Sequence, residues 1–325
     1  MTYNYSATQN NGRIVSASDA VATETVSYTY DALNRLIAAA NTTGKTWNES
    51  YSYDGFGNMT GKTSTRGTPA NPQVDPYTNR ARVINDYGFD ANGNWLGIYG
   101  PGGNLANTWN VENQLVSNGQ LDSSGNPFTY TYDPSGKRVL QYSVNSTYGP
   151  WGTLYFYSIT GQRLATYHVT YVNSNNPPLQ QSVSMYFGGR LLVPQDRLGS
   201  VRKNQNGPLA YFPWGEEESP TTPDGNDKYA TYFRDGTING AGQDYANARY
   251  YNNSFGRFWS ADPFRHASLS KPQTWNQYAY AGNDPVNASD PTGLFYAICE
   301  LLGTCGGDDG SEFKPETGDI DQLPS

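Results

Sequence analysis

The sequence repeats one short motif, an aromatic–polar–aromatic triplet that is followed by an aspartate and then by a glycine or asparagine. Successive copies start 21–25 residues apart, with one gap of 36 residues. Clear and degenerate copies begin at Tyr28, Tyr51, Tyr87, Trp109, Tyr130 and Tyr155. A period of this length is typical of repeat architectures, in which each unit is stabilised by packing against its neighbours.

Each copy of the motif predicts a β-hairpin. Alternation of aromatic and polar residues indicates a strand with one buried face. The aspartate and the glycine or asparagine after it predict a tight turn, and a second short strand follows. We interpret the aspartates as turn caps rather than calcium ligands, because no dense cluster of Asp and Asn accompanies them. A single hairpin is marginally stable in water, so the hairpins are expected to stack into a curled sheet.

The composition agrees with an all-β chain and argues against helical and charge-driven disordered classes. Of 325 residues, 27 are tyrosine, 35 glycine and 20 proline, and only 15% are charged. Tyrosine is favoured in strands, and glycine and proline in turns. The alternate spacing of the tyrosines predicts packing within the sheet; the alternative is that they form a sugar-binding platform.

The charge and the termini limit the partners and the location. The net charge of −8 disfavours a nucleic-acid-binding face, which needs a basic patch. No apolar run is long enough to span a membrane, and the first residues lack the features of a signal peptide. The two histidines, His168 and His266, lie far apart, so we expect neither a metal site nor another cofactor. Both cysteines, Cys299 and Cys305, lie in an acidic C-terminal tail.

From residue 183 the period is lost and a series of distinct motifs appears. They occupy residues 196–202 (DRLGSVR), 211–215 (YFPWG), 248–252 (ARYYN), 255–263 (FGRFWSADP) and 276–294 (NQYAYAGNDPVNASDPTGL). The hairpin motifs resemble the YD repeats of the Rhs family, and this later set resembles the Rhs repeat-associated core domain. The resemblance divides the chain into repeats at 1–182, a core domain at 183–294 and a variable tail at 295–325.

This resemblance implies a function. Rhs chains wind YD hairpins into a hollow shell that the core domain closes, and the segment beyond the core is usually a toxin that is cut free. The cut would fall here between Leu294 and Phe295. The implied partners are upstream YD repeats or a partner shell chain, and an enclosed toxin. The chain would be secreted or exposed on the cell surface through a route without a signal peptide, or as part of a longer chain.

The resemblance also implies that the core domain is the protease. Its two aspartates fall at Asp262 and Asp290, with Arg257 as the supporting residue. Two neighbouring carboxyl groups share a proton, so that one activates water while the other protonates the substrate. No Ser–His or Cys–His pair offers a competing nucleophile. The alternative interpretation is structural, because Asp-Pro is a common turn pair and recurs at Asp75, Asp133 and Asp284.

Two features depart from the family pattern. The tail is too short for an ordinary toxin enzyme, and its second half, 306–325, has the composition of a disordered segment. About six hairpins are also too few to close a shell, so we expect the C-terminal part of a longer protein. Two further hypotheses therefore stay open: a non-catalytic surface module that binds carbohydrate or protein, and a scaffold that encloses a separate polypeptide. Only self-cleavage requires Asp262 and Asp290.

Overall fold

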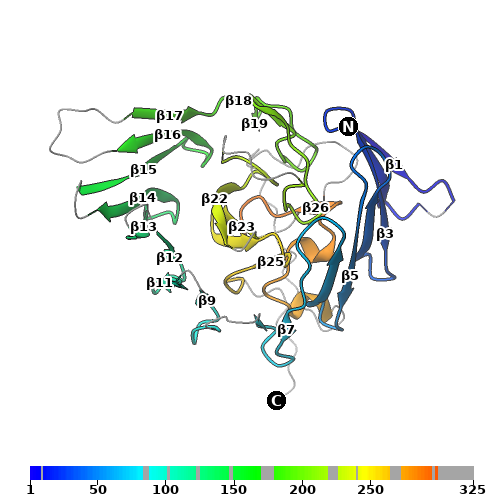
Figure 1. Ribbon diagram of the computed structural model, residues 1–325, viewed down its shortest axis with the longest axis horizontal. Coiled ribbons are helices and arrows are strands. Elements are labelled where there is room, and N and C mark those ends of the chain that lie inside the picture. The colour runs from blue at the N-terminus through cyan, green and yellow to red at the C-terminus, as the bar shows by residue number, and fades with distance from the viewer. Residues whose placement is uncertain are drawn as a thin grey trace, which may run out of the picture.

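The computed structural model shows a β-protein in which two antiparallel walls curve around a central block (Figure 1). It describes residues 1–8, 10–82, 88–100, 103–121, 125–145, 149–169, 179–218, 226–238, 241–263, 272–294 and 297–298. The only helical elements in these ranges are two short 3₁₀ turns, η1 (Pro272–Trp275) and η2 (Ala281–Asn283). No helix of the described part is long and apolar enough to cross a membrane. The predicted all-β class is confirmed.

The first wall is a six-stranded antiparallel sheet in which neighbours in sequence are neighbours in space. Its strands are β1 (Thr2–Tyr5), β2 (Ile14–Asp19), β3 (Glu24–Tyr30), β4 (Leu36–Asn41), β5 (Trp47–Tyr53) and β6 (Met59–Ser64). This order is the one expected when successive hairpins pair edge to edge.

The second wall has seven strands in the same simple order. They are β11 (Thr108–Trp109), β12 (Leu115–Leu121), β13 (Pro127–Tyr132), β14 (Arg138–Asn145), β15 (Gly149–Tyr157), β16 (Arg163–Val169) and β17 (Leu179–Val183). Two short pairs lie between the walls: β7 (Gln73–Val74) with β8 (Ala81–Arg82), and β9 (Gly97–Gly100) with β10 (Gly103–Ala106).

The repeats thus form two sheets rather than the one curled sheet that the sequence predicts. The break follows β6, where the chain contains Pro69, Pro72 and Pro76 within eight residues. Proline has no backbone N–H to donate to a neighbouring strand, so a continuous ladder of hydrogen bonds cannot pass through this segment.

The repeat aspartates cap tight turns, as predicted. Asp133 shows the geometry: its Oδ1 accepts hydrogen bonds from the backbone N–H groups of Ser135 and Lys137, both at 2.9 Å. Gly136 in this turn has a φ of +83°, a left-handed conformation that glycine adopts without strain. The aspartates at 31, 54 and 196 accept the same pair of bonds from the second and fourth residues after them.

In four copies of the motif the second aromatic residue joins its hairpin to the one before it, and Tyr186 makes the same contact after the last copy. In five places a tyrosine hydroxyl donates to a backbone carbonyl of a preceding hairpin, over 2.6–3.0 Å. The pairs are Tyr30 with Ile14, Tyr53 with Leu36, Tyr132 with Leu115, Tyr157 with Arg138, and Tyr186 with Arg163. These tyrosines are therefore part of the wall, which favours packing over a sugar-binding platform. The series also runs past residue 182, where the sequence predicts the repeats to end.

The central block is built from small β-elements of the C-terminal part of the chain. They are β18 (Tyr186–Phe187), β19 (Arg190–Leu191), β20 (Lys203–Asn204), β21 (Gly207–Pro208), β22 (Phe233–Ile238), β23 (Ala241–Ala246), β24 (Arg249–Asn252), β25 (Arg257–Phe258), β26 (Ala288–Ser289) and β27 (Ala297–Ile298). Strands β22–β25 form one antiparallel sheet, and β26 pairs with β27. Trp214, Tyr232, Tyr251 and Tyr280 are almost fully buried in an aromatic core.

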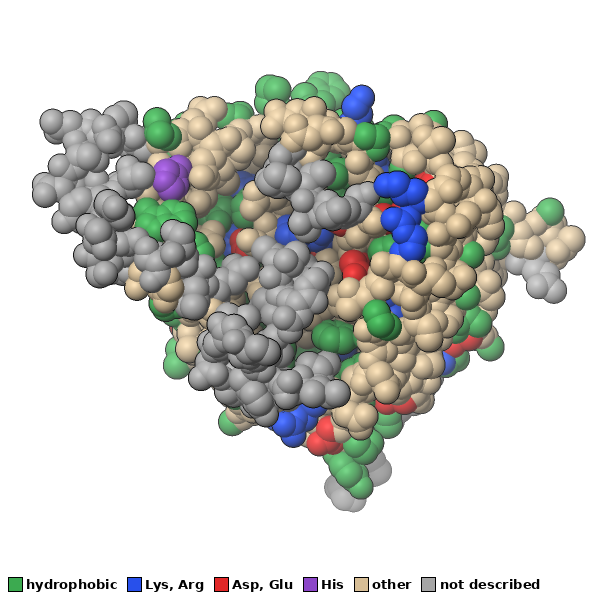
Figure 2. Space-filling model, in the orientation of Figure 1, with side chains coloured by type: hydrophobic (Ala, Val, Ile, Leu, Met, Phe, Trp, Pro, Cys, Tyr) green, Lys and Arg blue, Asp and Glu red, His purple; other side chains and the backbone are tan. Residues whose placement is uncertain are grey.

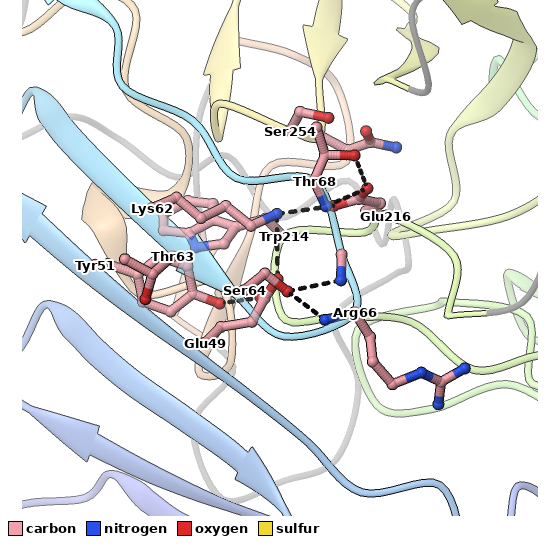
Figure 3. Close-up of polar contacts among 12 residues, drawn as sticks. Glu49, Tyr51, Lys62, Thr63, Ser64, Arg66, Thr68, Trp214, Glu216 and Ser254 are labelled. Carbon is pink, nitrogen blue, oxygen red and sulfur yellow. Dashed lines mark hydrogen bonds and ion pairs between the residues drawn. The ribbon is translucent and has the colours of Figure 1, made fainter.

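Ion pairs fasten the walls to this block. Arg202 of the block binds Asp19 and Glu24 of the first wall at 2.8 and 2.6 Å. Lys62 of β6 lies 2.8 Å from Glu216 of the block and 3.3 Å from Glu49 of β5 (Figure 3). Because the charges are buried, each is tolerated only while its partner is present. Figure 2 shows one face of the molecule, on which uncharged side chains and backbone predominate.

Glu218 is a protonatable contact between block and wall, and it predicts a pH dependence of stability. Its Oε1 accepts a hydrogen bond from Trp47 Nε1 at 2.6 Å. Burial, and then the neighbouring Glu24, raise the pKa of Glu218 from 4.5 to about 8, while Arg66 opposes the rise. A carboxyl whose pKa is higher in the folded state stabilises the fold below its unfolded pKa and loses that contribution as the pH rises through the folded pKa.

We therefore expect Glu218→Gln to flatten the fall in stability between about pH 5 and pH 8, because the amide stays neutral throughout. The free energy of unfolding in urea at several pH values measures this effect. Glu112→Gln, at an exposed turn, is the matched control and should leave the profile unchanged. Identical pH profiles for Glu218→Gln and the parent would show that Glu218 does not titrate in this pH range in the folded protein.

Candidate functional site

Both predicted aspartates lie in the central block, Asp290 directly after strand β26 and Asp262 four residues after strand β25. Asp262 follows β25, and its backbone N–H donates to the carbonyl of Gln277 at 2.9 Å. Asp290 follows β26 and begins the turn that leads to Leu294. The side chain of Asp290 is 3% exposed and that of Asp262 is 18% exposed. Asp262 is thus the carboxyl with more access to water.

One guanidinium group brings the two carboxyl groups together. Arg249, at the start of β24, places Nη2 3.2 Å from Oδ2 of Asp262 and 3.3 Å from Oδ2 of Asp290. The two oxygens are therefore separated by no more than the sum of these distances. Arg249 is 5% exposed, and its Cζ lies 3.7 Å from the ring centroid of Phe258. The sequence separates these aspartates by 28 residues, and the fold joins them through Arg249.

The surroundings of Arg249 disfavour its charged form, which is unusual for an arginine side chain. Burial lowers the pKa of Arg249, and the two carboxylates act in the opposite direction by favouring its charged form. Burial also raises the pKa of Tyr232 well above its ordinary value, and Asp290 adds to this rise. Burial raises the pKa of other tyrosines, such as Tyr51 and Tyr250, in the same way, so the feature that distinguishes this cluster is the buried guanidinium between two carboxyl groups.

The turn at Asp290 repeats the geometry of the wall turns. Asp290 Oδ1 accepts a hydrogen bond from the backbone N–H of Leu294 at 3.1 Å, four residues later, as Asp133 does from Lys137. Gly293 has a φ of +74° and donates its N–H to the carbonyl of Asp290 at 3.3 Å. Asp290 therefore caps a turn through Oδ1 and contacts Arg249 through Oδ2. It has the structural role that is common for an Asp-Pro pair, and it also belongs to the carboxyl cluster.

Arg257, the predicted supporting residue, binds elsewhere. Its Nη1 donates to Asn58 Oδ1 at 2.8 Å, and its Nη2 donates to the backbone carbonyl of Asn79. Burial lowers its pKa to about 10. These bonds attach the block to two wall turns, so the arginine that contacts the aspartates is Arg249. The sequence does not show which of the two arginines faces the aspartates, because both lie in residues 248–263. That choice depends on how β23, β24 and β25 pair.

A cleft of about 390 Å³ opens beside the cluster. Wall turns 112–114 and 135–137 line one side of it, and Arg249, Ser260, Thr292 and Leu294 line the other. The cleft gives water a route to the turn that ends at Leu294. Among the residues that the structure describes, no group of His, Cys, Asp and Glu side chains is arranged to hold a metal ion.

Several predicted features lie outside the described residues: Phe295, His266, both cysteines and most of the tail. The described pair Ala297–Ile298 returns to the block, where Ala297 pairs with Ser289 and Ile298 with Ala288. The backbone on both sides of the predicted cut is therefore attached to the same small sheet.

Comparisons with known proteins agree with the repeat assignment. Residues 10–46 match the RHS repeat family model. The tRNA nuclease WapA of Bacillus subtilis is 29% identical over a match of 239 residues. The match covers 66% of this chain and 9% of WapA. The chain thus spans about a tenth of the length of that relative.

Solved structures share the fold. The TcdB2-TccC3 crystal structure superimposes with a TM-score of 0.68 at 21% identity, and covers 90% of this chain and 17% of its own. The Tc holotoxin pore of Photorhabdus luminescens, solved with an aspartate-to-alanine substitution in TccC3, superimposes with a TM-score of 0.67 at 20% identity. It covers 92% of this chain and 17% of its own.

Proposed function

We propose that this chain is a shell component of a secreted polymorphic-toxin system, because residues 10–46 match the RHS repeat model and the chain shares the β-fold of the TccC3-containing structures. We propose further that its block at 183–294 cuts the chain once, between Leu294 and Phe295. The observation that carries the second part is the contact of one buried guanidinium, that of Arg249, with both Asp262 and Asp290.

The chemistry is hydrolysis of one peptide bond. Asp262, the more exposed carboxylate, takes a proton from a water molecule that enters through the cleft, and the water oxygen attacks the carbonyl carbon of Leu294. Asp290, the protonated partner of the pair, gives its proton to the carbonyl oxygen of Leu294, and Arg249 offsets the charge on the pair. The C–N bond to Phe295 then breaks: the Asp262 carboxyl group gives its proton to the amine of Phe295, and one hydroxyl of the intermediate returns its proton to Asp290. The products are a Leu294 carboxyl group, which ionises in water, and a tail with a free amino terminus.

The walls support the shell part of the proposal. Within the described residues, the outer strands β1 and β17 each pair with one neighbouring strand, which leaves a row of backbone N–H and C=O groups on the other edge for a further strand. Upstream YD repeats, or the repeats of a partner shell chain, would continue the same strand order. The tail would be the segment that the assembled shell releases.

The first test is the intact mass of the folded, soluble chain. We expect the parent to lose the segment after Leu294, and Asp262→Asn and Asp290→Asn to keep it, because an amide can neither activate water nor share the proton. Asp133→Asn is the matched control: it replaces the aspartate of a similar Asp-Pro turn in the wall, and it should be cut like the parent. A folded parent that keeps its full mass in the presence of its repeat partners would contradict the proposal.

A further inference from the structure

The turn before the predicted cut is held by its backbone. Four carbonyl groups in succession each accept a hydrogen bond from a different donor of the central block. Asp290 receives it from the Tyr232 hydroxyl, Pro291 from Asn247 Nδ2 at 3.2 Å, Thr292 from the Ala248 N–H at 3.0 Å, and Gly293 from Arg249 Nε.

Three of these donors are consecutive residues, Asn247, Ala248 and Arg249, at the turn between β23 and β24. Asn247 has a φ of +63°, a conformation that asparagine tolerates better than most residues. The fit against this turn is close, because a Cβ atom at Gly293 would lie 2.5 Å from the carbonyl oxygen of Ala246. We call residues 246–249 with Tyr232 the backbone clamp.

The clamp ends one residue before the predicted scissile bond. Leu294 is the next residue after the fourth held carbonyl, and its own N–H is bound by Asp290 Oδ1 at 3.1 Å. Arg249 belongs to both parts: Nε holds Gly293, and Nη2 holds the two aspartates. The Arg249 side chain therefore fixes the position of the Gly293 carbonyl relative to the two carboxyl groups.

We infer that the backbone clamp sets the position of the cut, one residue after Gly293, whatever side chains occupy positions 294 and 295. This inference rests on the proposed self-cleavage. The surroundings of Leu294 favour it over side-chain recognition, because its side chain is half-buried and packs in none of the hydrophobic clusters of the described residues. Asn113, Gln114, Ser135 and Lys137 are among the residues that line the cleft beside it. An apolar pocket would be needed to select leucine by its side chain.

Two variants distinguish positioning of the cut by the backbone clamp from recognition of the leucine side chain. Leu294→Ala should be cut at the same position as the parent. Insertion of one alanine between Gly293 and Leu294 should move the cut to the bond after the inserted alanine, so that the released tail begins with Leu294. The mass of the released tail, which differs by one leucine between the two hypotheses, gives the answer.

A third variant tests the clamp itself. Asn247→Gly removes the donor to Pro291, keeps the left-handed backbone conformation and leaves the aspartates in place. We expect cleavage at more than one bond near Leu294 with a thermal midpoint close to that of the parent. Asn206→Ala, at an exposed turn, is the control and should give a single tail.

The outcomes separate the two proposals. A parent that is never cut removes the proposed function and this inference with it. A parent that is cut, together with an insertion variant that is cut between leucine and phenylalanine or not at all, overturns the clamp and leaves the self-cleavage standing.

Discussion

Replacing Arg249 by lysine is expected to slow tail release by about 10²- to 10³-fold, while Arg257→Lys leaves it near the parent rate. Arg249 donates from Nε to Gly293 and from Nη2 to both aspartates. A lysine ammonium is a single point of charge and cannot hold the turn and the carboxyl pair at once. At Arg257, by contrast, a lysine can still donate to Asn58 Oδ1 or to the carbonyl of Asn79, both remote from the reaction.

The effect is large because Arg249 performs two tasks in one buried place. It offsets the charge of two carboxylates that otherwise repel each other, and it fixes their distance from the turn that carries the reacting carbonyl. A lysine keeps one positive charge but cannot donate to Gly293 and to both carboxyl groups together, so the carboxyl pair loses its fixed position relative to the reacting carbonyl.

The measurement is the half-time of tail release, followed by intact mass after refolding at several pH values. The thermal midpoint of each variant shows whether the fold is retained. Equal rates for Arg249→Lys and the parent, or a larger loss for Arg257→Lys than for Arg249→Lys, would return the supporting role to Arg257.

The contrast between these two arginines shows what the sequence can predict. Local signals were sufficient for the hairpins: alternating aromatics gave the strands, and Asp133 capped its turn as its neighbours Pro134 and Gly136 imply. The prediction that Asp262 and Asp290 act together rests on the resemblance to a family, and the structure places both side chains against the guanidinium of Arg249. Its chemical role stays a prediction.

What the sequence could not predict depends on register between distant strands. The direction of Arg249 follows from the pairing of Tyr251 in β24 with Asp244 in β23, which no local pattern encodes. The tyrosine hydroxyl contacts, such as Tyr53 with Leu36, are hidden for the same reason. The pairing of Arg202 with Asp19, which are 183 residues apart, needs the complete fold.

Replacing Arg138 by methionine is expected to destabilise the protein by about 3–5 kcal/mol. Arg138 belongs to β14 of the second wall and is fully buried. Its Nη2 donates to Oδ1 of Asp235 in the central block at 2.8 Å, and its Nη1 contacts the other carboxyl oxygen. Five aromatic rings surround its Cζ at 4.5–6.0 Å, from Tyr130, Tyr155, Phe233, Tyr245 and Tyr250.

The cost comes mainly from the partner that the substitution leaves behind. Methionine fills a similar volume among the rings, but the carboxylate of Asp235 is then buried without its cation. Replacing both members of a buried ion pair by apolar residues is often close to neutral, because no charge remains to be desolvated. We therefore expect Arg138→Met with Asp235→Leu to recover most of the stability lost by Arg138→Met alone.

Urea unfolding followed by tryptophan fluorescence measures these differences, since Trp95 and Trp259 lie in the aromatic cluster beside Arg138. Lys203→Met, at an exposed position of β20, is the control and should change the free energy of unfolding by less than about 0.5 kcal/mol. A double variant as unstable as Arg138→Met would locate the cost in the lost arginine–aromatic contacts rather than in the orphaned carboxylate. A loss below about 1 kcal/mol for Arg138→Met would mean that the second wall is attached to the block without this ion pair. The aromatic contacts between wall and block, such as Tyr155 with Phe233 and Tyr130 with Tyr250, would then carry the attachment.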